Sequence, residues 1–314
     1  VNGGATWAIN THWRHDWSLY NYVHADIHEM RFNGNTLYVG CDGGLFESSN
    51  FGNSWSDLST GLRIMQLYYI GVDQNSSSSV YGGTQDNGSN RFNNTTVVQH
   101  IRGADGMENI VSASNSNLVY SSNQYGDVYR STDGASSYVY IGNGTGNNPF
   151  YIDMELSPRS GQLFKTDFGV DRNPGFGTGF TGIGGTTTNA NGTFLCRDLS
   201  ISTSSDTLVS LDALERVYMC PNSDTSIFAI EWFEITNNLP DTAIDPISGD
   251  PLTLNTTSIY MNPTNSKEIW VTYSGYVDGH KVYKTTDGGN NWVNYSGTLP
   301  NVPVHDVYYQ SGTN

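Results

Sequence analysis

The stretch Thr285–Trp292, with the sequence TTDGGNNW, decides the fold of this chain. It follows the pattern Ser/Thr-x-Asp/Asn-x-Gly-x-Ser/Thr/Asn-aromatic. Asp287 at the third position can accept hydrogen bonds from nearby backbone N–H groups, as in an Asx turn. Gly289 can adopt a positive φ, and Trp292 then enters the next strand and packs between sheets. The stretch therefore predicts a tight turn between two β-strands.

Three further stretches repeat this pattern. Ser48–Trp55 matches it, and Ser131–Tyr138 departs from it only at Ala135, where glycine is expected. The chain begins inside a fourth copy, Val1–Trp7, which lacks the first position. The residues expected to form these turns are Asn2, Trp7, Ser48, Asn50, Gly52, Trp55, Ser131, Asp133, Tyr138, Thr285, Asp287, Gly289 and Trp292. We assign them a structural role and no catalytic role.

The spacing of the aromatic positions gives the number of repeats. Trp7 and Trp55 are 48 residues apart, Trp55 and Tyr138 are 83 apart, and Tyr138 and Trp292 are 154 apart. A four-stranded propeller blade repeats about every 40–50 residues, so these intervals hold one, two and three repeats. We therefore predict one all-β domain over 1–314, a β-propeller of about seven four-stranded blades with such turns. It is expected to be incomplete at its termini and to be a fragment of a longer protein.

The repeated motif resembles the Asp box of sialidase-like β-propellers. Gly40–Leu62 and Lys281–Val304 also resemble secreted surface proteins of the Bacteroidetes, whose propellers are similar to those of sortilin and of xyloglucanase-type glycoside hydrolases. The resemblance covers most of Val23–Tyr140 and Leu252–Tyr309. It implies an extracellular or bacterial cell-surface location and export as cargo of type IX secretion. It also implies that the Asp boxes lie away from the ligand-binding face.

Alternating apolar residues predict individual strands. We expect strands at Thr36–Cys41 and Leu67–Val72, and a first, inner strand of a further blade at Val302–Tyr309. Asn173–Asn191 is rich in glycine and threonine and is interpreted as a long loop. Asp241–Pro251 is interpreted as a turn-rich insertion.

Composition and charge exclude several classes of partner. The chain has 14 Lys and Arg against 30 Asp and Glu, which gives a net charge of −16. Nucleic acids and anionic membranes bind basic surfaces, so neither is expected as a partner. An acidic surface suits neutral sugars or cations. No apolar run approaches the ~18 residues of a membrane-spanning helix, so we expect no membrane insertion.

The cysteine content leaves two alternatives. Cys41, Cys196 and Cys220 are too few for a disulfide framework. A Cys196–Cys220 disulfide is expected if the protein is exported. The alternative is three buried thiols.

Three residues near the start of the first repeat are candidate ligand-binding residues. Alternation along a strand places His24, Asp26 and His28 on one face. Two imidazoles and a carboxylate form a donor set for Zn²⁺ or another transition metal. The alternative is an inner strand that lines a water-filled channel, where polar side chains stay hydrated. The sequence leaves the metal unknown.

Carboxylates form a second candidate site. Asp86 lies in a turn, and Asp105 and Glu108 lie together in the stretch GADGME. If the protein is a hydrolase, Asp86 and Asp105 are its catalytic pair, because glycoside hydrolysis uses two carboxyl groups. Glu108 is a ligand-binding candidate, and Asp153 and Glu155 could join the group. The alternative is that Asp86 and Asp105 cap turns.

Two functions from different classes follow. The first is an extracellular or cell-surface binding or structural module for polysaccharide or protein. The alternative is a glycoside hydrolase that acts on a plant or algal polysaccharide. The chain shows no nucleophile elbow, phosphate-binding loop, dinucleotide fingerprint or cysteine-rich zinc pattern. The arginine set of sialidases is also not recognisable.

Cofactors and partners follow from the same reasoning. We expect no cofactor, with a structural Ca²⁺ in the Asp/Asn-rich loops as an alternative that no EF-hand spacing supports. The expected partners are a polysaccharide or a surface protein, and the rest of a larger multidomain polypeptide.

Overall fold

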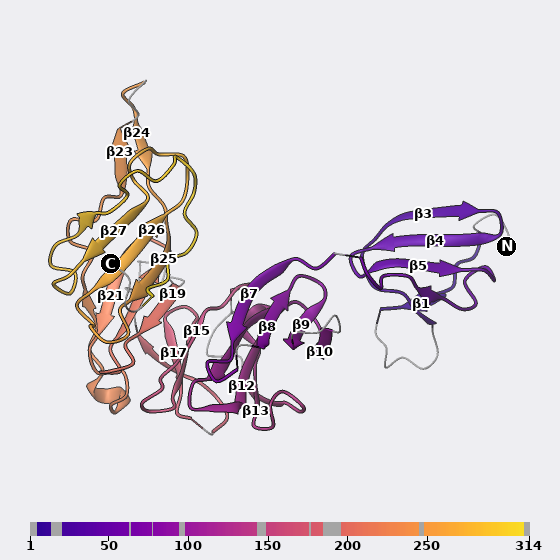
Figure 1. Cartoon of the computed structure of the whole chain (residues 1–314), viewed down its shortest axis with the longest axis horizontal. Helices are drawn as coiled ribbons and strands as arrows, with labels where there is room; N and C mark the ends of the chain where they lie inside the picture. Colours follow the sequence, from indigo (N-terminus) through magenta and orange to yellow (C-terminus); the bar gives the residue numbers. More distant parts are fainter. Residues whose placement is uncertain are drawn as a thin grey trace.

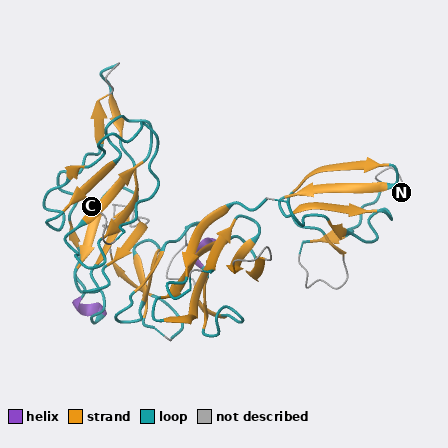
Figure 2. Cartoon of the chain, in the orientation of Figure 1, coloured by secondary structure: helices purple, strands orange, loops and turns teal. Residues whose placement is uncertain are grey.

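The computed structural model describes most of the chain as β-structure (Figure 2). The described residues are 5–13, 21–62, 64–76, 78–93, 98–142, 149–175, 177–184, 196–244 and 248–310. Among them, the only helical segments are the 3-10 turns η1 (Gln124–Gly126) and η2 (Ile227–Ala229). No helix formed by these residues is long and apolar enough to cross a membrane. The prediction of an all-β chain is therefore confirmed.

Six four-stranded antiparallel sheets make up the described structure, each with its strands side by side in chain order. The first contains β3 (Ile27–Asn33), β4 (Thr36–Cys41), β5 (Gly44–Ser48) and β6 (Ser56–Asp57). The second contains β7 (Leu67–Val72), β8 (Ser79–Thr84), β9 (Gly88–Asn93) and β10 (Val98–Arg102). The third contains β11 (Gly106–Ser112), β12 (Asn115–Asn123), β13 (Val128–Ser131) and β14 (Val139–Gly142).

The later sheets have the same order. The fourth contains β15 (Met154–Leu156), β16 (Leu163–Thr166), β17 (Val170–Asn173) and β18 (Thr181–Gly184). The fifth contains β19 (Cys196–Ile201), β20 (Leu208–Asp212), β21 (Val217–Cys220) and β22 (Phe233–Glu234). The sixth contains β25 (Thr256–Met261), β26 (Ile269–Tyr273), β27 (Val282–Thr285) and β28 (Val293–Asn294). Two small pairs accompany them, β1 (Thr11–His12) with β2 (Asn21–Tyr22) and β23 (Thr242–Ile244) with β24 (Pro251–Thr253).

The first strands of sheets two to six lie against one another in succession. β7 packs against β11, β11 against β15, β15 against β19, and β19 against β25, so these sheets follow an arc (Figure 1). Carboxylates near the first strand of one sheet accept hydrogen bonds from backbone N–H groups in the first strand of the next sheet. Asp153 Oδ2 accepts the Leu199 N–H at 2.8 Å, and Asp198 Oδ2 accepts the Ile259 N–H at 2.6 Å.

The chain continues beyond the sixth sheet along β25. Thr257 Oγ1 donates to the Val304 carbonyl oxygen at 2.6 Å, and the Tyr308 ring lies 4.6 Å from that of Tyr260. This segment forms no regular strand in the described residues. It nevertheless lies where the first strand of a seventh blade would lie.

The first sheet stands apart from the other five. Figure 1 shows β3, β4 and β5 joined to β7 through an extended segment, and β3 is exposed along its whole length. On β7, Gly71 faces β11, because a Cβ there would meet the Asn109 carbonyl oxygen at 1.9 Å. Alternation turns Ile70 to the opposite side, where it is 65% exposed. The first sheet therefore leaves this side of β7 uncovered.

Three of the four repeated turns share one set of hydrogen bonds. In the last, Gly289 N donates to Thr285 Oγ1 at 3.0 Å and Asn291 N donates to Asp287 Oδ1 at 3.0 Å. Equivalent bonds occur in the stretches that begin at Ser48 and Ser131. Ala135 takes the position of the glycine with φ 70°, so the turn keeps its shape without glycine.

The aromatic residue of the turn packs in some copies and not in others. Trp292 is 4% exposed and its Nε1 donates to the Ile235 carbonyl oxygen at 2.9 Å. Trp55 and Tyr138 are half-buried. Trp7 is 90% exposed, so it does not pack between sheets as expected. Asn2 of the same copy lies outside the described residues.

The Cys196–Cys220 disulfide, one of the two alternatives for the cysteines, is absent, and all three cysteines are free. Cys196 pairs with Asp212 at one end of β20, and Cys220 pairs with Leu208 at the other end. Four residues of strand separate these positions by about 13 Å along β20. A disulfide needs Cα atoms within about 7 Å, so the bond cannot form. The alternative of buried thiols holds for Cys196 and Cys220, whereas Cys41 is partly exposed.

Candidate functional site

A cavity of about 570 Å³ lies between the β1–β2 pair, the segment that precedes β3, and one end of the second sheet. Its size is typical of sites for small molecules or sugars, which are ~300–1,000 Å³. Two aromatic side chains, Trp13 and Tyr22, line it. The polar side chains that line it are His24, Asp26, Asp86, Asn87, Asn90, His100, Asp105 and Gln124. The site therefore combines residues of the β1–β2 pair, of the second sheet and of several connections between strands.

The structure brings the predicted pair Asp86 and Asp105 together, but not as two free carboxyl groups. Asp86 N donates to Asp105 Oδ1 at 2.6 Å. Asp105 is itself held by Gln124, whose Oε1 accepts the Asp105 N–H at 3.0 Å. One carboxylate oxygen of Asp105 is thus used to fix the turn that carries Asp86.

The environment of Asp86 changes its ionisation. Burial, the charge of Asp105, and a hydrogen bond with the Asp42 carboxyl group raise the pKa of Asp86 to about 6. A hydrogen bond with His28 has the opposite effect on Asp42 and lowers its pKa. Asp86 therefore takes up a proton before Asp42 does as the pH falls, and its protonated carboxyl group can then donate a hydrogen bond to the Asp42 carboxylate.

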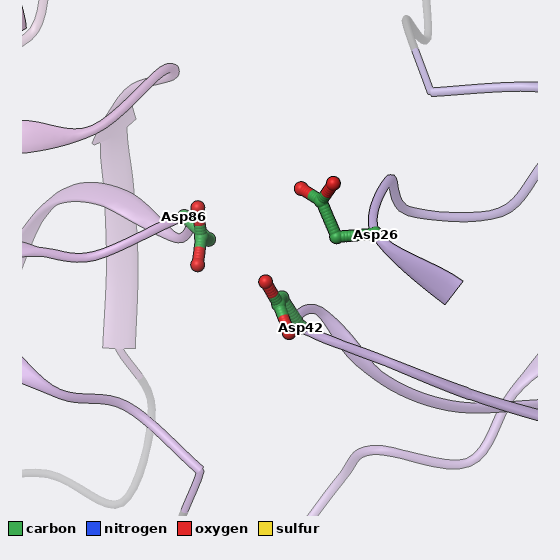
Figure 3. A group of neighbouring side chains, drawn as sticks. All are labelled: Asp26, Asp42 and Asp86. Carbon is green, nitrogen blue, oxygen red and sulfur yellow. The ribbon is translucent and has the colours of Figure 1, made fainter. Parts of the chain in front are cut away.

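Asp26, Asp42 and Asp86 form a compact group (Figure 3). One carboxylate oxygen from each lies within 4.8 Å of the others. Asp26 and Asp42 come from the first sheet and Asp86 comes from the second. Carboxylate oxygens are ligands for hard cations, so these three residues could hold one. Asp42 is not among the residues predicted from the sequence, and its only local signal is its position before Gly43 and Gly44.

The expected row of His24, Asp26 and His28 on one strand face is wrong. Asp26 has φ 56° and precedes β3, so strand alternation does not extend back to His24. His24 Nε2 instead forms a hydrogen bond with the Asp86 carbonyl oxygen at 2.9 Å. His28 pairs with Asp42, and this hydrogen bond raises the pKa of His28. The three side chains therefore serve different contacts.

Glu108 lies outside the cavity. It is half-buried on β11, and its carboxylate accepts the N–H of Met154 on β15. Burial is the main cause that raises the pKa of Glu108 to about 8. Asp153 and Glu155 lie close enough to interact with it, and burial raises the pKa of both. This group joins inner strands and does not line the site.

Four residues at or next to the cavity have a left-handed backbone. Asp26, Asp86, Ala104 and Tyr125 have φ angles of 56°, 59°, 68° and 63°. Non-glycine residues rarely adopt this conformation, which costs about 1–3 kcal/mol each. The same conformation occurs away from the cavity in the described residues Phe51, Ala135, Asp206, Glu215 and Asn237. The strain therefore belongs to turns throughout the fold and does not by itself mark the cavity as the functional region.

Comparisons with known proteins give matches in structure only. No protein-family model matches the chain, and no curated protein matches it. The GH74 xyloglucanase of Xanthomonas campestris matches with a TM-score of 0.54 at 13% identity, over 82% of this chain and 43% of that chain. PorZ of Porphyromonas gingivalis, described as a surface component of the type IX secretion system, matches with a TM-score of 0.51 at 13% identity. That match covers 89% of this chain and 43% of PorZ. YCF48 bound to a D1 peptide matches with a TM-score of 0.50 at 12% identity, over 88% of this chain and 84% of that chain.

These likenesses define the class of fold. The matched proteins are β-propellers, and the consecutive four-stranded sheets of this chain have the same architecture. The predicted β-propeller fold is therefore confirmed. The chain spans less than half the length of the first GH74 enzymes it matches, 38% and 45%. At sequence identities of 12–13%, these structural matches are evidence for the fold alone.

Proposed function

We propose that this chain is an extracellular or cell-surface β-propeller that binds a polysaccharide. The observation that carries the proposal is the composition of the cavity. Trp13 and Tyr22 offer apolar ring surfaces, while Asn87, Asn90 and Gln124 offer amide donors and acceptors. Sugar rings present both C–H faces and hydroxyl groups, so a wall of this kind complements them.

Charge narrows the class of polysaccharide. Three carboxylates line the cavity, and the whole chain carries a net charge of −16. Anionic polymers would be repelled from such a surface. A neutral polysaccharide is therefore the proposed ligand, and a surface protein is the less favoured partner.

A glycoside hydrolase is the second candidate, favoured by the ionisation of Asp86. A carboxyl group with a pKa of about 6 is suited to donate a proton near neutral pH. The hydrogen bond that Asp105 accepts from the Asp86 N–H counts against this candidate, because both carboxyl groups of a hydrolase must face the scissile bond. Binding without hydrolysis is the better-supported function.

The experiment is a binding screen with product analysis. The full chain is tested against soluble neutral polysaccharides, and each mixture is assayed for new reducing ends. Retention without new ends supports the binding module. Release of oligosaccharides that is abolished by Asp86→Asn or Asp105→Asn, in variants with unchanged circular dichroism, would establish the hydrolase instead.

A matched pair of variants tests the cavity itself. Trp13→Ala removes a ring from the cavity wall, and we expect about tenfold weaker binding, as for an anchoring aromatic residue. Trp7→Ala removes a ring that is 90% exposed outside the cavity and should bind like the wild type. Equal affinities of the two variants would count against this site.

Three further proposals concern context. Export through type IX secretion rests on the sequence resemblance, and PorZ adds only a likeness in fold. The sortilin-like assignment rests on the repeated turns.

A structural Ca²⁺ would bind Asp26, Asp42 and Asp86. Weak extracellular sites bind Ca²⁺ in about the millimolar range, so addition of about 5 mM Ca²⁺ should raise Tm. An unchanged Tm would remove the Ca²⁺ proposal.

A further inference from the structure

Four aromatic residues form a continuous strip beside the cavity. The strip consists of Tyr68 on β7, Tyr125 in η1, and Phe150 and Tyr151 before β15. The ring of Tyr68 lies 5.2 Å from that of Tyr151, which lies 4.9 Å from that of Phe150. The ring of Phe150 lies 5.4 Å from that of Tyr125. The aromatic strip therefore crosses from the second sheet to the third and fourth.

Backbone contacts connect the aromatic strip to the cavity. Tyr125 directly follows Gln124, which lines the cavity and accepts the Asp105 N–H. Tyr125 N in turn donates to the Phe150 carbonyl oxygen at 3.3 Å. At the other end of the strip, burial raises the pKa of the Tyr68 hydroxyl group, and Tyr68 is close enough for the charges of Asp105 and Asp86 to raise this pKa further. The strip thus lies close to the residues that line the cavity.

Two members of the aromatic strip are exposed, and Tyr68 and Phe150 are half-buried. Tyr125 is 60% exposed and Tyr151 is 49% exposed. The backbone of Tyr125 is left-handed, a conformation in which a bulky side chain costs about 1–3 kcal/mol. Glycine would fit this position without strain. Backbone conformation therefore does not explain an aromatic residue at this position, and the contact with Phe150 leaves more than half of the Tyr125 side chain exposed.

We infer that the aromatic strip binds a further length of the neutral polysaccharide chain whose end or middle occupies the cavity. The ligand is then an extended polymer that crosses three sheets, rather than a short oligosaccharide. This inference rests on the proposed function. Aromatic faces carry partial negative charge and attract the C–H faces of sugar rings, and three of the four residues also offer hydroxyl groups. The nearby Asp86 and Asp105 disfavour anionic polymers.

The test compares polymers with short fragments of the same polymer. The probes are hydroxyethylcellulose, glucomannan and xyloglucan, with carboxymethylcellulose as the anionic counterpart and tetrasaccharides released from each neutral polymer. Affinities are measured by affinity electrophoresis and calorimetry. Tyr125→Gly removes the ring and relieves the backbone strain, and an unchanged circular dichroism spectrum and Tm establish that the variant is folded. Tyr125→Phe keeps the ring. Tyr276→Ala removes a ring that is 73% exposed in the β26–β27 connection and serves as a matched control.

The expected result is selective. Tyr125→Gly and Tyr151→Ala should weaken polymer binding about tenfold, a change of 1.4 kcal/mol, while tetrasaccharide binding stays within twofold of wild type. Tyr125→Phe and Tyr276→Ala should bind the polymer like wild type. If the wild-type protein binds no neutral polymer, the proposed function fails and this inference fails with it. Two outcomes overturn the inference but not the proposed function, provided that the wild-type protein binds a neutral polymer. In the first, Tyr125→Gly binds the polymer as tightly as wild type. In the second, Tyr125→Gly has lost affinity for the polymer and for the tetrasaccharide to the same extent.

Discussion

The backbone N–H of Asp86 donates a 2.6 Å hydrogen bond to Oδ1 of Asp105, and this bond joins the second sheet to the start of the third. Asp86 lies in the β8–β9 turn, whereas Asp105 directly precedes β11. The bond closes one side of the cavity and fixes the left-handed backbone of Asp86. A carboxylate that sequence patterns favour as catalytic is thus also a cap for a neighbouring turn.

The cap predicts different effects for two substitutions of Asp105. Asp105→Ala should lower the free energy of unfolding by about 1–2 kcal/mol, because it leaves the Asp86 N–H without its acceptor. Asp105→Asn keeps an acceptor oxygen and should cost less than half as much. Urea unfolding followed by circular dichroism measures both. Equal losses for the two variants would contradict the capping role.

The repeated turns predict a contrast between two tryptophans at the same motif position. Trp292→Ala should cost about 3–5 kcal/mol, because it removes a buried aromatic side chain and the hydrogen bond to Ile235. Trp7→Ala should change stability by less than about 0.5 kcal/mol, because the side chain is exposed. Chemical denaturation of both variants gives the comparison. A large loss for Trp7→Ala would mean that this side chain packs in solution.

The carboxyl group of Glu108 predicts lower stability at alkaline pH. Burial raises its pKa from 4.5 to about 8 in the folded state. The stability linked to such a group is fully present below the unfolded pKa and is lost as pH rises through the folded pKa. Tm should therefore fall between about pH 5 and pH 9. Glu108→Gln, which carries no charge, should flatten this fall, and an equal pH dependence of both proteins would refute the assignment.

The cysteines predict a specific pattern of thiol reactivity. Cys196 and Cys220 are buried, and burial raises the pKa of each thiol. Only Cys41 should react with an aromatic disulfide reagent in the folded protein, and slowly, because burial also raises its pKa. All three thiols should react after unfolding without reductant. A single reactive thiol in the unfolded protein would show that Cys196 and Cys220 are joined.

The sequence predicts regular repeats well and contacts between sheets poorly. The predicted strands Thr36–Cys41 and Leu67–Val72 coincide with β4 and β7, because alternation and flanking turns define them locally. β18 falls within Asn173–Asn191, which is predicted as a loop. β23 falls within Asp241–Pro251, which is predicted as a turn-rich insertion, and β24 begins at its last residue. Pairing with a neighbouring strand overrides weak intrinsic preference in both places.

The candidate site shows the same division. Asp86 and Asp105 are recognisable from local turn chemistry, and both line the cavity. Asp42 is not recognisable, because its importance arises from contact with the carboxyl group of Asp86 in another sheet. The row that includes His24 fails because strand alternation begins only after Asp26. Residue type predicts which groups can act, and the arrangement of sheets decides which of them meet.

The succession of contacts from β7 to β11, β15, β19 and β25 bears on how the chain is made and how it evolves. Each new sheet needs a surface that the preceding sheet already offers, so the sheets can assemble in order as they emerge from the ribosome. Folding by addition of neighbours is typical of repeat architectures. Because each sheet contacts mainly its neighbours, gain or loss of one whole sheet changes only the contacts at that position. The arc can therefore become longer while the remaining sheets keep their packing.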